Sequence, residues 1–242
     1  MVQAILIFAL AAFSALKGAT ASRHVEGQQV ILGSQHNSAD DVHHVLKKLE
    51  KADIVPTVMD AFVPSFLVEA EWSSKHYASL GNTLKPKKLQ DAPSISLHQS
   101  ESSSGSCALL ANTTYTVAIT DPDAPSRDDP KWSEICHWIA TAVPLDDADG
   151  SSCPHIKLSS LQDVMPYKPP GPPEKTGKHR YVFFVFVPAN GTTDPLHLTK
   201  PEDRQHWGYK YNGERVGVRR WAVDNGLAPV AANFIYAQHK KQ

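Results

Sequence analysis

The chain has 242 residues, enough for one sizeable domain or two small ones. Its 24 lysine and arginine residues nearly balance its 25 aspartate and glutamate residues, so the formal net charge of −1 gives no general attraction to nucleic acid or to an acidic membrane. The hydrophobic share of 41% is ordinary for a globular protein with a packed core.

Residues 1–21 are typical of a secretory signal peptide. The stretch from Ala4 to Leu16 is apolar except for Ser14, and it is short for a membrane-spanning helix, which disfavours a membrane anchor. Residues 19–21 (Ala-Thr-Ala) form a small-x-small cleavage pattern, so we expect a mature chain that begins at Ser22. A secreted or vacuolar location follows, and no later segment is long and apolar enough for stable membrane insertion.

Two N-x-[ST] triplets agree with the secretory route and make Asn112 and Asn190 candidate glycosylation sites. The chain has three cysteines, Cys107, Cys136 and Cys153. In an oxidising compartment one pair can close and leave one thiol free, and the sequence does not indicate which pair. The cysteine spacing matches no zinc-binding pattern.

The first ordered element that the sequence predicts is a helix. Residues 22–37 are polar, and we expect a flexible N-terminal segment there, followed by one domain over residues 38–242. Ser38 is a suitable N-cap for the helix. Spacings of three and four residues place one apolar set on a single helix face: Val42, Val45, Leu46 and Leu49.

From Ser65 onward the apolar residues follow the pattern of strands. Strands are predicted over residues 65–72, 92–98, 115–120, 135–143, 180–188 and 228–238, with a polar connector over residues 99–106. The strand over residues 180–188 is almost wholly apolar, which indicates burial on both faces.

Two further helices are predicted near the C-terminus. A capping-box pattern at residues 199–202 predicts a short helix. A second helix is expected within residues 214–227, with Gly226 placed to end it. Because strands dominate and no strand-helix-strand alternation occurs, the sequence favours an antiparallel sheet with peripheral helices over a parallel doubly wound sheet.

The segment TDPDAPSRDDPKWSEICHWIA (Thr120–Ala140) is rigid and acidic, with four aspartates and three prolines. The residue before a proline is pushed into an extended conformation, so Asp121 should continue and end the preceding strand. Asp121 either binds a ligand or fixes the turn, and the local sequence does not separate these roles. We interpret Asp123 as a turn-fixing acid with Arg127 as its partner.

Two histidines follow similar proline-containing loops. His137 should share a strand face with Ile135 and Ile139, which by itself is typical of a core histidine. In KPPGPPEKTGKHRY, His179 and Tyr181 should point to one side of a strand and Arg180 to the other. If these strands are neighbours, four polar residues line one cleft suited to a small anion: Asp121, His137, His179 and Tyr181.

No catalytic motif stands out in the chain. There is no G-x-S-x-G, no H-E-x-x-H and no Walker-type phosphate loop. We therefore predict no enzyme activity, no catalytic residues, no metal ligands and no cofactor. A hydrolase that uses Asp121 and a histidine to activate water is the alternative, but no nucleophile or oxyanion donor accompanies them.

Two motifs, DPDAPSRDDPKWSEICHW and GPPEKTGKHRYVFFVF, resemble those of the phosphatidylethanolamine-binding protein family, which includes Raf kinase inhibitor proteins and fungal carboxypeptidase Y inhibitors. The resemblance extends from about Leu46 to Gln238. It implies a mostly β (α+β) fold, in which a large antiparallel sheet packs on a smaller sheet with helices at the periphery. It also implies a pocket for anions and phospholipid headgroups, with these residues: Asp121, Asp123, Pro125, His137, Pro173, His179 and Tyr181.

The N-terminal part of the match, including IVPTVMDAFVPSFLVEAEW, looks most similar to the carboxypeptidase inhibitor branch. The resemblance therefore implies a secreted or vacuolar inhibitor of a serine carboxypeptidase, with a small anion or phospholipid headgroup as ligand. Either the pocket or residues 22–37 would block a site that recognises a terminal carboxylate. A phospholipid or anion binder without protease inhibition is the main alternative, and a purely structural secreted domain is another. No nucleic acid partner is expected.

Overall fold

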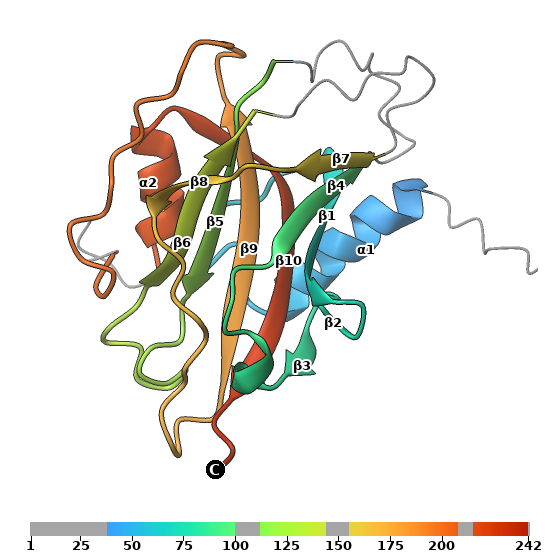
Figure 1. Ribbon diagram of the computed structural model, residues 1–242. Helices are drawn as coiled ribbons and strands as arrows, with labels where there is room; N and C mark the ends of the chain where they lie inside the picture. Colours follow the sequence, from blue (N-terminus) through green and yellow to red (C-terminus); the bar gives the residue numbers. More distant parts are fainter. Residues whose placement is uncertain (1–37, 100–111, 144–154, 208–214, 242) are drawn as a thin grey trace, which may run out of the picture. The chain divides into compact units, whose positions relative to one another are not determined.

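Two β-sheets and two α-helices account for most of the regular structure in the computed structural model (Figure 1). The structure describes residues 38–99, 112–143, 155–207 and 215–241, all within the unit His36–Gln242. The expected signal peptide (residues 1–21), the N-terminal segment (22–37) and nearly all of the polar connector lie outside the described residues.

The larger sheet has six strands in the described residues, in the order β3-β10-β9-β5-β6-β8. Their bounds are Asn82–Leu84 for β3, Leu227–Gln238 for β10, Lys178–Pro188 for β9, Tyr115–Asp121 for β5, Ile135–Ala142 for β6 and Gln162–Met165 for β8. All neighbours pair antiparallel except β10 and β3, which are parallel.

The smaller sheet has the order β2-β1-β4-β7 and is antiparallel. Its strands are β1 (Phe66–Ser73), β2 (His76–Tyr77), β4 (Ser94–Gln99) and β7 (His155–Leu158). A 3-10 turn, Pro86–Lys88, lies between β3 and β4. The predicted fold, a large sheet on a smaller one with peripheral helices, is therefore confirmed.

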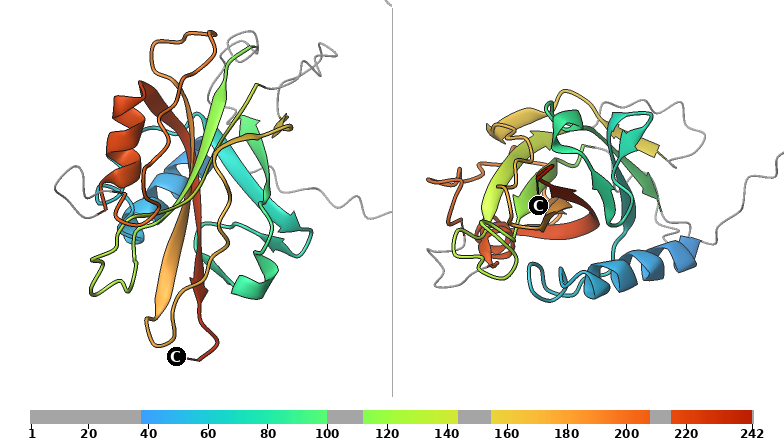
Figure 2. Two further views of the ribbon diagram at one scale, coloured as in Figure 1. Left: turned by 60° about the vertical axis from the view of Figure 1, so that its left-hand side comes forward. Right: turned by 90° about the horizontal axis from the view of Figure 1, so that it is seen from below.

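The larger sheet is buried on both faces, which explains the almost continuous apolar sequence of β9. On one face, Phe184 and Phe186 pack in a cluster with residues of α1 (Ser38–Lys51) and α2 (Gly217–Asp224). On the other face, Phe183 packs in a second cluster with residues of β1 and β4. The result is three layers, with helices on one side of the larger sheet and the smaller sheet on the other (Figure 2).

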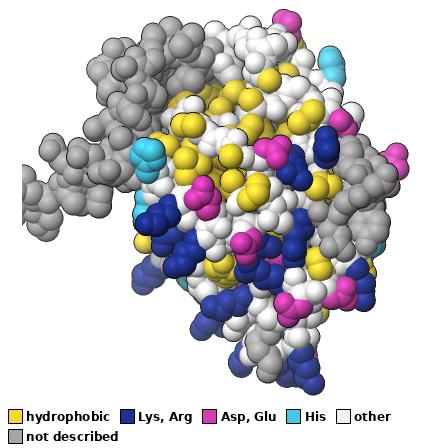
Figure 3. All heavy atoms as spheres, turned by 180° about the vertical axis from the view of Figure 1, so that it is seen from behind, with side chains coloured by type: hydrophobic (Ala, Val, Ile, Leu, Met, Phe, Trp, Pro, Cys, Tyr) yellow, Lys and Arg dark blue, Asp and Glu magenta, His cyan; other side chains and the backbone are white. Residues whose placement is uncertain are grey.

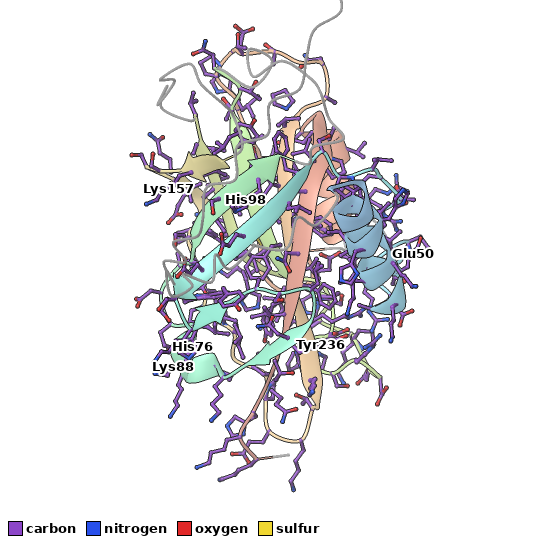
Figure 4. All side chains as sticks on the ribbon, turned by 90° about the vertical axis from the view of Figure 1, so that its right-hand side faces the viewer. Glu50, His76, Lys88, His98, Lys157 and Tyr236 are labelled. Carbon is purple, nitrogen blue, oxygen red and sulfur yellow. The ribbon has the colours of Figure 1, made fainter. Side chains whose placement is uncertain are left out.

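Helix α1 buries the predicted apolar face: Val42, Val45 and Leu49 are buried, and Leu46 is partly buried. Lys47, Glu50 and Lys51 are exposed, and Glu50 faces outward in Figure 4. The two α-helices of the described residues have 14 and 8 residues. Neither has the length and apolar character that crossing a membrane requires.

The helix predicted at residues 199–202 is wrong, because that segment is irregular. Its polar groups bond to α2 and its end instead of to each other. The Thr199 N–H donates to Asn225 Oδ1 at 2.8 Å, and the Thr199 carbonyl accepts from Trp221 Nε1 at 2.8 Å. The helix predicted in residues 214–227 is confirmed as α2, and Gly226 follows it with a positive φ of 63°.

Acidic and basic side chains are interspersed on the surface, in keeping with the balanced composition. The face in Figure 3 has an upper region rich in hydrophobic side chains and a lower region where lysine and arginine alternate with acids. Exposed ion pairs of this kind include Lys131 with Asp129 at 3.0 Å. Such pairs contribute little to stability because water screens them.

Candidate functional site

A cavity of about 160 Å³ lies where the ends of β5, β6 and β9 meet the proline-containing loops. Its lining includes six of the seven predicted site residues: Asp121, Pro125, His137, Pro173, His179 and Tyr181. The structure therefore brings together the four polar residues that the sequence grouped. Their chain positions are far apart, and the antiparallel pairing of β5 with both β6 and β9 makes them neighbours.

Asp121 and His179 form a buried pair at the bottom of this cavity. Asp121 ends β5 and is 2% exposed, and its Oδ2 accepts a hydrogen bond from His179 Nδ1 at 2.9 Å. Burial by itself lowers the pKa of His179, but the hydrogen bond and negative charge of Asp121 outweigh burial and hold that pKa above its usual value. The pairing therefore favours the imidazolium form of His179, in which its charge cancels that of Asp121.

The second ring nitrogen of His179 is also engaged. His179 Nε2 lies 3.0 Å from the hydroxyl oxygen of Thr176, and that hydroxyl donates to the carbonyl of Pro173 at 2.9 Å. The hydroxyl oxygen must then accept a hydrogen bond from Nε2–H, which agrees with a doubly protonated ring. Both N–H groups of His179 are thus hydrogen bonded to protein atoms, and the ring acts mainly by fixing the position of Asp121.

His137 has a ring nitrogen without a protein partner among the described residues. Its Nδ1 donates to the carbonyl of Lys168 at 2.7 Å, which leaves Nε2 as an acceptor in the neutral ring. Nε2 is buried and has no hydrogen-bond partner in the described part of the chain. Burial lowers the pKa of His137, and the nearby charge of Asp121 offsets this only in part. His137 is therefore neutral at pH 7.

A β-bulge directs His137 into the cavity. Ile119 pairs with Trp138 and Thr120 pairs with Cys136, so His137 is an extra residue in β6. Its ring packs edge-on against Tyr181, with centroids 5.0 Å apart. Tyr181 and Ile139 belong to core clusters on opposite faces of the sheet. The predicted face shared by His137 and Ile139 is therefore wrong, because the bulge interrupts the alternation.

Tyr181 completes the polar wall of the cavity. Burial raises its pKa well above 10, and its contact with the Asp121 carboxylate raises it further. The side chain is consequently a neutral phenol that donates to Asp121. As predicted, Tyr181 and His179 lie on one side of β9, while Arg180 lies on the other.

Asp123 lies behind the cavity and does not line it. It is fully buried, and its two oxygens accept from Arg180 Nε at 2.8 Å and Arg180 Nη2 at 2.5 Å. Arg180 also reaches the end of α1, where Nη1 donates to the carbonyls of Ala52 and Asp53 at 2.7 and 2.8 Å. The predicted partnership with Arg127 is wrong: Arg127 pairs on the surface with Asp53, at 2.6 Å.

The backbone N–H of Arg180 also donates to Asp123, at 2.9 Å. Since Arg180 follows His179 directly, this bond fixes the position of the histidine in the cavity. The backbone N–H of Asp123 in turn donates to Asp121 Oδ1 at 2.8 Å. Asp123 therefore helps to position both Asp121 and His179 through these backbone hydrogen bonds.

Seven cavity-lining residues are not among the predicted site residues: Ala124, Trp132, Ile135, Lys168, Gly171, Pro172 and Gln205. Lys168 begins the second proline-containing motif, but a single lysine gives no recognisable sequence signal. Gln205 has no local signal, because it reaches the cavity through backbone pairing of its segment. The N–H of Cys136 donates to the Arg204 carbonyl at 2.8 Å, and the N–H of His206 donates to the Trp132 carbonyl at 3.1 Å.

Glu134 is a second buried acid that the sequence did not single out. Its Oε2 accepts from the Thr120 hydroxyl and, at 3.4 Å, from the backbone N–H of Val218 at the start of α2. Its Oε1 has no partner among the described residues. Burial raises the pKa of Glu134 to about 7, although these hydrogen bonds act in the opposite direction. Glu134 packs beside the cavity-forming strands without lining the cavity.

The remaining predicted sites lie apart from the cavity. Asn112 and Asn190 are both exposed. Cys136 is a free, fully buried thiol, and burial raises its pKa, so it is not a reactive nucleophile. Cys107 and Cys153 lie outside the described residues. Within the described ranges, no group of three or more His, Cys, Asp or Glu side chains is placed to hold a metal ion.

Comparison with known proteins identifies relatives of this chain. The sequence is 31% identical over 194 residues to the carboxypeptidase Y inhibitor of Saccharomyces cerevisiae, covering 74% of this chain and 87% of the inhibitor. It is also 35% identical over 201 residues to an uncharacterized protein of the same yeast, covering 81% of this chain and 94% of that protein.

Among solved structures, the chain resembles a carboxypeptidase Y inhibitor crystallised in complex with its cognate proteinase. The TM-score is 0.71 at 29% identity, and the match covers 83% of this chain and 98% of the inhibitor. A sequence model of the family described as phosphatidylethanolamine-binding protein matches residues 74–235, which include every cavity residue named above. On these grounds the chain belongs to the phosphatidylethanolamine-binding protein family.

Proposed function

We propose that this protein inhibits a serine carboxypeptidase of the carboxypeptidase Y type and that its cavity binds a small oxyanion or a phospholipid headgroup. The inhibitory role is supported by one observation above all: the similarity covers 98% of an inhibitor seen in complex with its proteinase, at a TM-score of 0.71. The similarity thus extends over nearly the whole inhibitor, which supports the proposed role more strongly than one shared motif would.

The part of the chain that blocks the protease is proposed to be the N-terminal segment. A carboxypeptidase accepts the end of a polypeptide, whereas the cavity described here is recessed between strand ends and walled by prolines. A small cavity of that kind suits a small molecule and offers no chain end to a protease. Residues 22–35 of that segment, which precede α1 in the chain, are the better candidate.

We expect the mature chain to inhibit hydrolysis of a blocked dipeptide by a yeast-type serine carboxypeptidase, measured as residual release of the C-terminal residue. Deleting residues 22–35 should raise the inhibition constant at least about tenfold. The matched control is Asp121→Asn, which alters the cavity and should leave inhibition unchanged. Absence of inhibition by the intact chain would contradict the proposed inhibitory role. Loss of inhibition only in Asp121→Asn would show that the cavity, and not the N-terminal segment, blocks the protease.

The proposal includes passage through the secretory pathway, with cleavage before Ser22 and glycosylation at Asn112 and Asn190. The exposure of both asparagines supports their modification. A purified natural chain that still begins at Met1 would contradict this part of the proposal.

Anion binding by the cavity is supported by a separate observation, the buried Nε2 of His137. His137 lines the cavity and its Nε2 has no partner in the described residues, whereas both N–H groups of His179 are engaged. Below its lowered pKa, His137 becomes an imidazolium whose Nδ1–H stays on the Lys168 carbonyl and whose Nε2–H points to the ligand. Acidification therefore adds both a donor and a positive charge to the cavity.

Affinity for an oxyanion should consequently rise as the pH falls below 6.5. Sulfate is a suitable probe because its charge does not change over this range, and calorimetric titration from pH 7.5 to 4.5 measures the effect. The wild type should bind at least about tenfold more tightly at the acidic end, since charge-assisted hydrogen bonds are roughly twice as strong as neutral ones.

His137→Asn should bind sulfate with an affinity that barely changes with pH, while His44→Asn, altered on the exposed side of α1, should behave like the wild type. A wild-type affinity that is independent of pH would contradict the assignment of His137 as the ligand-facing group.

A further inference from the structure

The fixed charges deep in the cavity cancel. Asp121 and His179 are hydrogen bonded at 2.9 Å, and both ring nitrogens of His179 lie against acceptors, which favours an ion pair without net charge. His137 is neutral at pH 7 because burial lowers its pKa, and Tyr181 is a neutral phenol. These four side chains therefore offer an anion polar contacts but no net positive charge.

Lys168 is the cation among the cavity-lining residues that no acid neutralises within the described chain. It forms no ion pair with a described residue, and its side chain is exposed at the opening. The other basic group close to His137 is Arg204, whose guanidinium is engaged by the carbonyls of Cys136, His137 and Pro166. Arg204 does not line the cavity, whereas Lys168 does.

The backbone holds Lys168 directly beside the ligand-facing histidine. The Lys168 N–H donates to the His137 carbonyl at 2.7 Å, and His137 Nδ1 donates back to the Lys168 carbonyl at 2.7 Å. Pro169 and Pro170 follow and restrict the backbone further. The Lys168 ammonium is close enough to His137 to contribute to the lowering of its pKa. An anion that reaches His137 Nε2 is therefore within the field of this lysine.

We infer that Lys168 sets the charge selectivity of the cavity and makes it prefer dianionic oxyanions, such as phosphate monoesters, to monoanionic ones, such as the phosphodiester of a lipid headgroup. This inference rests on the proposed anion-binding function of the cavity. Its physical basis is that Coulomb attraction to one positive charge is proportional to the charge of the ligand, so a dianion gains twice the attraction of a monoanion at the same place.

The test compares methyl phosphate, mainly a dianion at pH 8, with dimethyl phosphate, a monoanion, by calorimetric titration of the full mature chain at one ionic strength. The wild type should prefer methyl phosphate. Lys168→Gln should weaken methyl phosphate binding about tenfold and dimethyl phosphate binding about threefold. The binding free energy lost with the lysine is proportional to the charge of the ligand, so the logarithm of the first factor is twice that of the second. The preference of the wild type should shrink accordingly.

Lys175→Gln is the matched control, because Lys175 is exposed in the same loop region and does not line the cavity. It should change neither affinity by more than about twofold, since solvent screens distant charges. Equal weakening of both ligands, no weakening in Lys168→Gln, or the same weakening in Lys175→Gln would each overturn the role of Lys168 while anion binding stands. Failure of the wild type to bind either ligand would instead overturn the proposed anion cavity, and Lys168 selectivity with it.

Discussion

Replacing Arg180 with alanine should lower the free energy of unfolding by about 3–5 kcal/mol, the usual result of removing one partner of a buried ion pair. Arg180 is 1% exposed and Asp123 is 0% exposed, so the carboxylate would remain buried with only the more distant Arg215 guanidinium, 3.6 Å away, as a charge partner. The carbonyls of Ala52 and Asp53 would lose their donor as well. Urea unfolding followed by tryptophan fluorescence measures the change.

The control is Arg127→Ala. Arg127 also pairs with an aspartate, Asp53, at 2.6 Å, but both side chains are substantially exposed. Its removal should cost about 0–1 kcal/mol, as expected of a surface pair. A loss in Arg180→Ala no larger than that in Arg127→Ala would show that Asp123 does not depend on Arg180 for its charge.

The second large effect concerns the dependence of stability on pH. Burial raises the pKa of Glu134 from 4.5 to about 7 in the folded protein. The folded state therefore binds this proton more tightly than the unfolded chain does. Ionisation of Glu134 costs no stability below about pH 4.5, and the cost in stability grows as the pH rises through 7. Since one pKa unit is worth about 1.4 kcal/mol, the full cost is on the order of 3 kcal/mol.

Glu134→Gln should remove this cost, because glutamine keeps an acceptor for Thr120 and Val218 without a charge. The variant should gain stability relative to the wild type as the pH rises from 4.5 to 8.5, by on the order of 3 kcal/mol, measured by urea unfolding at each pH. Glu50→Gln, a change at an exposed acid on α1, should show no such trend. Parallel pH profiles for Glu134→Gln and wild type would refute a raised pKa at Glu134.

Much of the fold could be predicted because its long strands carry strong periodic patterns. The apolar residues of β1 alternate and those of β9 are nearly continuous, and both follow from how each sheet face is buried. The short strands β2, β3, β7 and β8 were missed because two to four residues are too few to show a period. The false helix at residues 199–202 arose because its capping signal was local, whereas the bonds to Asn225 and Trp221 come from tertiary contacts.

The polar wall of the cavity was predictable for a similar reason. Alternation along β9 separates His179 and Tyr181 from Arg180, and a proline after Asp121 ends β5 in an extended conformation. The partner of Asp123 was not predictable, because Arg180 is 57 residues away and Arg127 lies close in the sequence. Glu134 gave no signal, since its burial depends on α2, a helix more than eighty residues further along the chain.

The bulge in β6 has a consequence for how this site can be lost in evolution. Beyond the bulge, Ile139 pairs in register with Ala118. Conservative substitutions in the core therefore do not change the direction in which the His137 side chain points. Deleting one residue at the bulge would restore plain alternation and turn the imidazole toward the helical layer. A single in-frame codon deletion would thus give a protein of the same fold that lacks the proposed ligand-facing imidazole.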